Sequence, residues 1–280
     1  MMARLVAVDL DGTLIGNDLV ISDADRAAIA RAVSAGIHVV LETGRLFSAS
    51  KPFAVELGLH GPIAGLQGGV IYDVDSGALL HAQPLSATVA LAAYDDLVRK
   101  DFHLQLYFGD SLYLDRMSAA STEYLRLSRV EPVMVPDLRA LLTGPALTGA
   151  PLHGDLMKLL AIGAPDLVAA EIPALARQLG SQANVFRSLP QYLEVTDPAA
   201  DKGHALMRIA AILGVDLADC AAIGDSDNDV PMFKVVAESF AVANATEAAK
   251  NAATRVVAER GAGVAEALAM LVLGDACGRT

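Results

Sequence analysis

Short apolar segments that end in polar clusters alternate along this chain with segments of helical periodicity. Three of these segments stand out: residues 4–8 run into Asp-Leu-Asp-Gly, residues 37–42 into Thr-Gly-Arg, and residues 219–224 into Asp-Ser-Asp-Asn-Asp. Strands that alternate with helices are typical of a parallel sheet with helices on both faces. In an open sheet of this kind, ligands bind beyond the carboxyl ends of the strands. The sequence therefore predicts an α/β fold in which the three polar clusters converge.

The character of the sequence changes near Pro84. A helix pattern is followed there by two alternating segments around Gly109 and Asp110, and this block holds most of the tyrosines. The regular alternation of strand and helix returns at about Lys202. We predict a doubly wound, Rossmann-like α/β core with a parallel sheet, formed by residues 1–83 and 189–280. An α+β cap domain, residues 84–188, is inserted between the two parts of the core.

The first helix has a clear start and end in the sequence. Ser22 is a suitable N-cap, Asp25 supports it three residues later, and Gly36 is a suitable stop. The second helix candidate, residues 47–58, contains Pro52, which shortens or kinks a helix.

Composition narrows the possible partners and location. The 280 residues are 54% hydrophobic and carry a net charge of −12, which disfavours nucleic acid and anionic membranes as partners. Cys220 and Cys277 have no spacing typical of disulfide frameworks or metal sites. No secretory signal and no apolar stretch of about 18 residues is expected, so we predict a cytoplasmic protein without a membrane span. The sequence does not indicate an oligomeric state.

The acidic residues at the strand ends suggest a metal site. Convergence would bring Asp9, Asp11 and Asp225 within a few ångströms of one another, and Asp229 belongs to the same motif as Asp225. Two unit charges ~4 Å apart repel by roughly 4 kcal/mol at an effective dielectric constant of ~20. Mg²⁺, which prefers oxygen ligands, removes this cost. Each motif alone is common in surface turns, but their joint occurrence after strands of one sheet favours a functional site.

The order of four motifs resembles that of a known enzyme family. DLDGTL at residues 9–14, TGR at 43–45, the Lys202-Gly203 pair and GDSDND at 224–229 follow one another along the chain. In this order they resemble the haloacid dehalogenase-like (HAD) phosphatases, and more narrowly the Cof-type branch. That branch carries a large α/β cap between its second and third motifs. The resemblance extends over nearly all of the chain.

The resemblance implies catalytic roles for the acids and the lysine. Asp9 would be the nucleophile that accepts the phosphoryl group as an aspartyl phosphate. Asp11 would be the general acid/base, which protonates the leaving oxygen and then activates water. Lys202 would offset the negative charge of Asp9 and the phosphate. Such a carboxylate nucleophile divides hydrolysis into two easier displacements. Positioning and charge neutralisation are what phosphoryl transfer requires.

The resemblance also implies which residues hold the phosphate and the metal. Thr43 and the Gly44 amide would bind phosphoryl oxygens, and Asn228 would orient the phosphate. Asp225 would bind Mg²⁺ beside Asp9 and the backbone carbonyl of Asp11, while Asp229 would stand behind these ligands. Arg45 could either grip a substrate anion or pair with a nearby acid.

Two positions depart from the family pattern. Gln67-Gly68-Gly69 stands where relatives usually have Asn-Gly, which puts the usual asparagine contact with substrate in doubt. Asn244 is retained, although the Met-Gly that commonly precedes it is not. In the inserted block, Tyr107, Tyr113, Arg116 and His153 are weaker candidates for substrate contact, because aromatic residues on strands more often serve packing.

We therefore expect a Mg²⁺-dependent phosphatase acting on a small phosphorylated metabolite, such as a sugar phosphate, nucleotide or cofactor phosphate. The large cap favours a small substrate, because such an insert can close over the site. A phosphomutase or phosphotransferase on the same scaffold is the first alternative. A non-catalytic metabolite-sensing module is the second.

Overall fold

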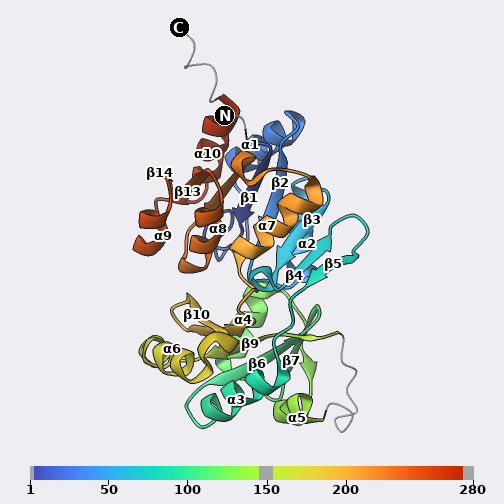
Figure 1. Ribbon diagram of the computed structural model, residues 1–280, viewed down its shortest axis with the longest axis vertical. Helices are drawn as coiled ribbons and strands as arrows, with labels where there is room; N and C mark the ends of the chain where they lie inside the picture. The colour runs from blue at the N-terminus through green and yellow to red at the C-terminus, as the bar shows by residue number, and fades with distance from the viewer. Residues whose placement is uncertain (1–2, 145–153, 274–280) are drawn as a thin grey trace. The chain divides into compact units, whose positions relative to one another are not determined.

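The computed structural model describes residues 3–144 and 154–273, which form two compact units (Figure 1). The first unit comprises the chain up to Gly44, then Ser50–Leu80, and the chain from Asp201 onward. The second comprises Arg45–Ala49 and His81–Ala200. The chain is thus an α/β protein in which one unit is inserted into the other.

The first unit is built on an eight-stranded sheet of order β14-β13-β12-β1-β2-β3-β4-β5. In the part of this sheet from β14 to β3, each strand runs parallel to its neighbours, whereas β4 is antiparallel to β3. β1, at the centre, is buried along its whole length. The strands are β1 (Leu5–Asp9), β2 (His38–Glu42), β3 (Pro62–Gly65), β4 (Val70–Asp73), β5 (Leu79–Ala82), β12 (Cys220–Gly224), β13 (Glu238–Val242) and β14 (Arg255–Val257).

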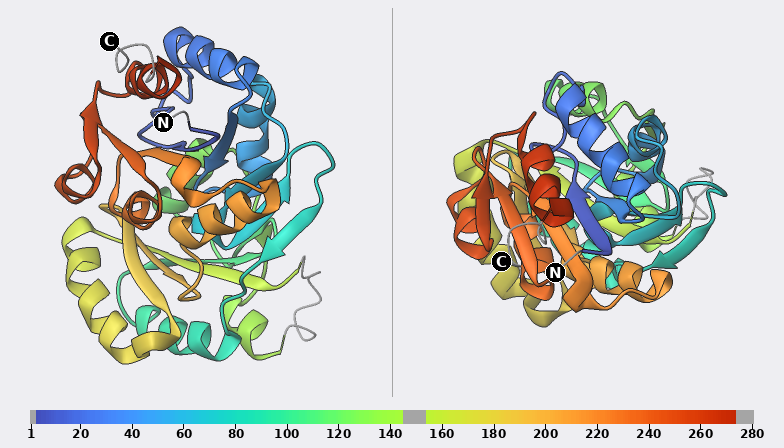
Figure 2. Two further views of the ribbon diagram at one scale, coloured as in Figure 1. Left: turned by 45° about the horizontal axis from the view of Figure 1, so that its top comes forward. Right: turned by 90° about the horizontal axis from the view of Figure 1, so that it is seen from above.

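Helices cover both faces of this sheet, as predicted (Figure 2). α1 packs against α10 on one face, and α7 packs against α8 on the other. This division follows from right-handed crossovers that leave β1 in one direction and β12 in the other. The helices are α1 (Asp23–Ser34), α2 (Phe47–Glu56), α7 (Lys202–Leu213), α8 (Val230–Val235), α9 (Glu247–Ala252) and α10 (Gly263–Leu273).

The predicted start of α1 is confirmed. The Ser22 hydroxyl accepts a hydrogen bond from the Asp25 amide at 3.0 Å, and it donates to the Asp25 carboxylate at 2.9 Å. The other carboxylate oxygen of Asp25 accepts from the Ala265 amide at 2.8 Å. This buried acid therefore holds the N-cap residue of α1 and joins the helix to the beginning of α10.

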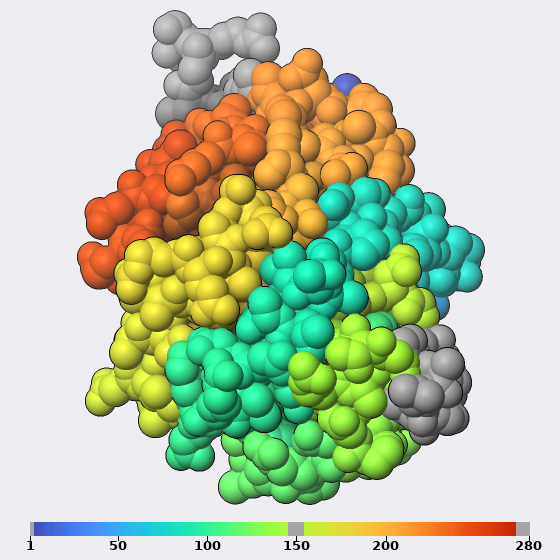
Figure 3. Space-filling model, turned by 60° about the horizontal axis from the view of Figure 1, so that its bottom comes forward, coloured from blue at the N-terminus to red at the C-terminus, as the bar shows by residue number. Residues whose placement is uncertain are grey.

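The second unit has a six-stranded sheet of order β10-β11-β9-β6-β7-β8. Leucine, valine and alanine side chains of α3, α5 and α6 pack on one face of it and form a continuous apolar core. The unit's helix-covered side is the one that faces the viewer in Figure 3. The elements are α3 (Ala87–Leu97), β6 (His103–Phe108), β7 (Ser111–Leu114), α4 (Ala119–Ser128), β8 (Val133–Met134), α5 (Leu138–Thr143), β9 (Leu156–Ile162), α6 (Pro165–Leu179), β10 (Asn184–Leu189) and β11 (Tyr192–Thr196).

The second unit extends beyond residue 188, where the sequence predicted the cap to end. β10 and β11 form an antiparallel hairpin, and β11 also pairs with β9 at the centre of the second sheet. A boundary at residue 188 would cut this hairpin, so the unit continues to Ala200. The sequence also gave no element for α4, although Ser118 and Ser121 form a capping box at its start.

In the ranges that the structure describes, no helix is long and apolar enough to cross a membrane. Cys220 is buried in β12 with a free thiol. Cys277 and His153 lie outside the described residues.

Candidate functional site

The three polar clusters follow strands that are direct neighbours in the first sheet. β1 lies between β12 and β2, with Val8 beside Ile223 and Asp9 beside Glu42. Asp9 is the last residue of β1, Thr43 follows β2, and Gly224 ends β12. The predicted convergence of these segments at one edge of the sheet is therefore confirmed.

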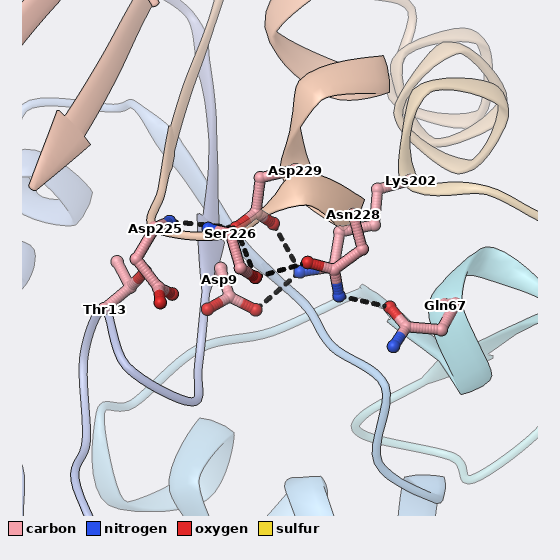
Figure 4. A network of polar contacts seen from close by, with 8 residues as sticks. All are labelled: Asp9, Thr13, Gln67, Lys202, Asp225, Ser226, Asn228 and Asp229. Atoms are coloured by element: carbon pink, nitrogen blue, oxygen red, sulfur yellow. Dashed lines mark hydrogen bonds and ion pairs between the residues drawn. The ribbon is translucent and has the colours of Figure 1, made fainter. Parts of the chain in front are cut away.

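Three carboxylates gather at this edge. Asp9, Asp225 and Asp229 each offer an oxygen atom, and these atoms all lie within 4.8 Å of one another. Figure 4 shows the Asp9 and Asp225 side chains side by side on separate segments, with Asp229 above them in this view. Such a group of oxygen atoms suits a hard divalent cation.

Lys202 lies against this cluster. Its ammonium group donates to Asp9 Oδ1 and to Asp229 Oδ1, both at 2.5 Å, and the side chain is fully buried. Lys202 is the first residue of α7, and Asp201 caps the helix by accepting from the His204 amide at 2.9 Å. The helix start thereby fixes the direction in which Lys202 points (Figure 4).

Asp229 holds the loop after β12 in shape. Its Oδ2 accepts hydrogen bonds from the amides of Asp225 and Ser226, both at 2.9 Å, while Oδ1 binds Lys202. A Cβ atom on Gly224 would lie 2.5 Å from Asp229 Cγ, so only glycine allows this close return of the chain. Both oxygens of Asp229 are thus used in orienting Asp225 and Lys202, which agrees with a place behind the direct metal ligands.

Asp9 retains one unused oxygen atom. Oδ2 is buried and accepts no hydrogen bond within the described chain, although Oδ1 is bound to Lys202. Three carboxylates beside one ammonium leave an excess of two negative charges in the cluster. A buried carboxylate oxygen without a partner is costly, and a divalent cation would supply both a ligand bond and the missing charge. The residues therefore fit a metal ion held by Asp9 and Asp225.

The electrostatic environment of the acids is consistent with this requirement. Burial raises the pKa of Asp9 well above its usual range; Lys202 opposes the rise, and Asp229 and Asp225 add to it. Burial likewise raises the pKa of Asp225 to about 6, with a further contribution from Asp229. Burial alone would lower the pKa of Lys202, but Asp229 and Asp9 outweigh it and raise the pKa, so the lysine is charged.

The loop after Asp9 is fastened to the loop after β12. The Thr13 hydroxyl donates to Asp225 Oδ1 at 2.8 Å, and the Asn244 amide donates to the Gly12 carbonyl at 2.9 Å. Gly12 has φ +93°, and a Cβ there would lie 2.4 Å from Asp225 Oδ2. The Asp-Gly-Thr sequence thus permits the close approach that brings Asp225 beside Asp9.

Asp11 does not belong to the carboxylate cluster. β1 ends at Asp9, and the chain then enters a turn in which the Gly12 amide donates to the Ile15 carbonyl at 2.8 Å. Asp9 is buried, whereas Asp11 is exposed. The group of three carboxylates therefore does not include Asp11, which lies beyond the end of the strand. Metal binding through its backbone carbonyl stays a prediction.

Gln67, at the position that departs from the family pattern, belongs to the site. Its Oε1 accepts a hydrogen bond from Asn228 Nδ2 at 2.8 Å, and Ser226 donates in turn to Asn228 Oδ1 (Figure 4). Gln67 is buried and has φ +61°, a conformation that costs free energy for a non-glycine residue. The longer amide thus orients Asn228, the residue that the sequence assigned to the phosphate.

The remaining predicted residues lie along the segment after β2. Thr43 is fully buried, and its amide donates to the Ala64 carbonyl at 3.0 Å. Gly44 follows it, and Gln67 Nε2 lies 2.4 Å from where a Cβ on Gly44 would be. Arg45 belongs to the second unit, where its guanidinium donates to the Leu127 carbonyl at the end of α4 at 2.9 Å. This contact with a backbone carbonyl differs from both expected roles of Arg45, which were binding a substrate anion and pairing with an acid.

Glu42 is a buried acid for which the sequence predicted no role. It is the last residue of β2, beside Asp9, and neither carboxylate oxygen accepts a hydrogen bond within the described chain. Burial raises the pKa of Glu42 well above its usual range, and Lys202 opposes the rise only in part. The sequence signal that could have indicated a buried acid is the position of Glu42 at the end of a largely apolar strand, His38–Glu42.

We expect Glu42→Gln to stabilise the protein at alkaline pH. Because the folded-state pKa of Glu42 is raised, its contribution to stability is complete below the unfolded-state pKa of ~4.3 and is lost as pH rises through the folded-state pKa. The free energy of unfolding should therefore increase in the variant by about 1–3 kcal/mol at pH 8, and much less near pH 4. Urea unfolding across this range measures the difference. Glu247→Gln, on an exposed side chain, is the matched control; an equal gain at both pH values would contradict the explanation.

Comparison with known proteins identifies relatives over most of the chain. The family model described as haloacid dehalogenase-like hydrolase matches residues 6–268. A 5-amino-6-(5-phospho-D-ribitylamino)uracil phosphatase of Bacillus subtilis is 28% identical over 284 residues, covering 90% of this chain and 92% of its own. An HMP-PP phosphatase of Cronobacter sakazakii is 29% identical over 244 residues, covering 87% and 85%.

A solved structure shares the fold. The haloacid dehalogenase-like hydrolase from Bacteroides thetaiotaomicron superposes with a TM-score of 0.80 at 27% sequence identity, covering 95% of this chain and 98% of that one. The likeness therefore includes both the sheet that carries the carboxylates and the inserted unit.

Proposed function

Because this chain belongs to the haloacid dehalogenase-like hydrolase family, we propose that it is a Mg²⁺-dependent phosphatase of small phosphorylated metabolites. The observation that carries the proposal is the buried Asp9 carboxylate, with one oxygen held by Lys202 and the other accepting no hydrogen bond from any described residue. The names of relatives support it, since two are phosphatases of small molecules.

The proposed roles follow from the contacts of each residue. Asp9 attacks phosphorus and forms an aspartyl phosphate; Lys202 holds its carboxylate in one orientation and neutralises charge that builds up during the transfer. Asp11, exposed at the turn after β1, donates a proton to the ester oxygen as its bond to phosphorus breaks. It then takes a proton from the water that attacks the aspartyl phosphate, which releases inorganic phosphate and restores Asp9. A Mg²⁺ ion held by Asp9 and Asp225 would supply positive charge to the phosphoryl oxygens.

The phosphate-binding role falls to residues after β2 and β12. Thr43 and Gly44 would bind phosphoryl oxygens, since they follow the strand next to β1. Asn228, oriented by Gln67 and Ser226, would direct its amide toward the phosphate. For Arg45 we propose an anchoring role through its hydrogen bond to the Leu127 carbonyl.

Phosphate release from a panel of phosphorylated metabolites, with and without Mg²⁺, tests the proposal. We expect release that requires the metal and is multiple-turnover. Formation of an isomeric phosphate with little free phosphate would replace the phosphatase by a mutase. Stable binding of a phosphorylated metabolite without any turnover would replace it by a sensor.

Mg²⁺ should also stabilise the folded protein independently of catalysis. A ligand that binds only the folded state at 100 times its Kd contributes about 2.7 kcal/mol. We expect the Tm to rise with MgCl2 in the wild type and to stay constant in Asp225→Asn, which lacks one of the two proposed ligands. Thermal unfolding monitored by circular dichroism measures both. An equal rise in the two proteins would show that the ion binds elsewhere.

A further inference from the structure

The turn that carries Asp11 is held from outside by one asparagine side chain. Asn244 lies in the segment after β13, two strands away from β1 in the first sheet. Its Nδ2 donates to the Gly12 carbonyl at 2.9 Å, and its Oδ1 accepts from the Arg260 amide, in the segment after β14, at 2.8 Å. A single amide side chain therefore joins the segments that follow β1, β13 and β14.

Hydrogen bonds hold the backbone on both sides of Gly12. The peptide group before Gly12 is held by its amide, which donates to the Ile15 carbonyl at 2.8 Å. The peptide group after it is held by its carbonyl, which accepts from Asn244. Because peptide groups are planar, two fixed planes determine φ and ψ of the residue between them. Glycine adopts many conformations, so the φ of +93° at Gly12 depends on these bonds.

The orientation of the Asp11 backbone follows from this arrangement. The Asp11 carbonyl and the Gly12 amide belong to one trans peptide group, so they point in opposite directions. Since the amide points to Ile15, the Asp11 carbonyl points away from it. The position of Asp11 is therefore tied to the two planes at Gly12, of which Asn244 holds one.

The segment after β13 also holds the loop that carries Asp225. The Thr246 amide donates to the Asp225 carbonyl at 2.7 Å. The Thr13 hydroxyl donates to Asp225 Oδ1, and Figure 4 shows these two side chains next to each other. The distance between the turn after β1 and the loop after β12 is thus set from a third segment, through Asn244 and Thr246.

The second anchor of Asn244 is itself close to the loop after Asp9. A Cβ atom on Gly16 would lie 2.6 Å from Arg260 Cζ, and the Arg260 guanidinium lies 3.8 Å from Asp18. Asn244 is exposed, so burial of apolar surface gives it little value. Its contribution lies in two directed hydrogen bonds that hold one turn against another.

We propose that Asn244 is a positioning residue for the reaction, because its bond to the Gly12 carbonyl fixes the turn that presents Asp11 to the leaving oxygen. The inference rests on the proposed phosphatase function, in which Asp11 donates a proton to that oxygen. Asn244 acts only through the backbone of the turn.

The effect of a displaced Asp11 depends on the leaving group. When the bond from phosphorus to the ester oxygen breaks, its electron pair stays on the oxygen. An alkyl ester leaves as an alcohol only if that oxygen gains a proton, whereas p-nitrophenolate is a stable anion and leaves without one. Loss of the proton donor's position therefore slows an alkyl phosphate more than p-nitrophenyl phosphate.

The test compares two esters in the wild type and in Asn244→Leu, which keeps a similar size and lacks both hydrogen bonds. The quantity is the ratio of kcat for glucose 6-phosphate or ribitol 5-phosphate, whichever the wild type hydrolyses faster, to kcat for p-nitrophenyl phosphate. We expect this ratio to fall roughly 10- to 100-fold, with KM little changed. Circular dichroism and Tm establish that the variant is folded.

A second variant separates the two bonds of Asn244. Asn244→Asp can still accept from the Arg260 amide but cannot donate to the Gly12 carbonyl, so the ratio should fall in the same direction. Asn251→Leu, an exposed position on α9, is the matched control and should leave the ratio unchanged. An unchanged ratio in Asn244→Leu or Asn244→Asp, or an equal loss with both esters, would overturn the inference.

A wild type that does not hydrolyse an alkyl ester would contradict the proposed function and not the positioning of the turn. Calorimetric binding of Mg²⁺ then tests the inference, because the Asp11 carbonyl is an expected ligand. We expect the Kd for Mg²⁺ to rise roughly tenfold in Asn244→Leu and to stay constant in Asn251→Leu. Equal binding by the wild type and Asn244→Leu, or no binding by the wild type, would refute it.

Discussion

Replacing Asp9 by asparagine is expected to lower kcat/KM for every phosphorylated substrate by more than ~10⁴-fold. The amide lacks the nucleophilic carboxylate that forms the proposed aspartyl phosphate. The fold should persist, because the asparagine oxygen can still accept from Lys202, which also keeps its bond to Asp229. Steady-state phosphate release and thermal unfolding of the variant measure the two effects separately.

Asp227→Asn provides the matched control for this substitution. Asp227 belongs to the same motif as Asp225 and Asp229, but it is exposed and accepts a hydrogen bond from Thr246 at 2.7 Å. An asparagine oxygen can accept the same bond, so activity should stay close to that of the wild type. Metal-dependent turnover by Asp9→Asn at a rate similar to that of this control would rule out Asp9 as the nucleophile.

Replacing Lys202 by methionine is expected to cause the largest loss of stability of any single change at the site. Lys202 is the shared partner of two buried carboxylates, and breaking a buried ion pair from one side costs about 3–5 kcal/mol. Without the ammonium group the pKa of Asp9, which burial already raises, rises further. The free energy of unfolding should therefore decrease more steeply with increasing pH than in the wild type.

A second variant separates the electrostatic explanation from lost packing. Adding Asp229→Asn to Lys202→Met removes one uncompensated charge and should restore part of the stability, but not the activity. Lys100→Met, which disrupts a partly exposed ion pair, should cost only about 1 kcal/mol or less. Urea unfolding of the three proteins is the measurement. A double variant no more stable than Lys202→Met would show that charge burial is not the cause.

Much of the fold could be predicted because its signals are local. The Ser22 cap and the apolar strands, such as Leu5–Asp9 and Cys220–Gly224, depend on residues a few positions apart. Periodicity and capping act over that range. The place of the site followed from a rule of topology, since polar clusters at the ends of parallel strands meet at one edge of the sheet.

The extent of the second unit depended on strand pairing. β10 and β11 look like any other apolar segments, and only the pairing of β11 with β9 assigns them to the second sheet. α4 was missed because its serine capping box is a weak signal inside a polar stretch. Pairing between strands depends on side chains far apart in the sequence, which a local pattern does not reveal.

The sequence by itself determined which residue types reach the site: the Asp9 carboxylate at the end of a central strand, the acids after β12, and a lysine at a helix start. Only the tertiary structure decided which of them interact. It brought Lys202 to Asp9 across 193 positions of sequence and left Asp11 outside the group of three carboxylates. It also left the Glu42 carboxylate buried with no hydrogen bond in the described residues, and placed Lys158 beside Glu194 in the second sheet. The physical reason is that burial and charge pairing are properties of neighbours in space. The strand order β12-β1-β2 creates those neighbours, and no short stretch of the sequence contains them.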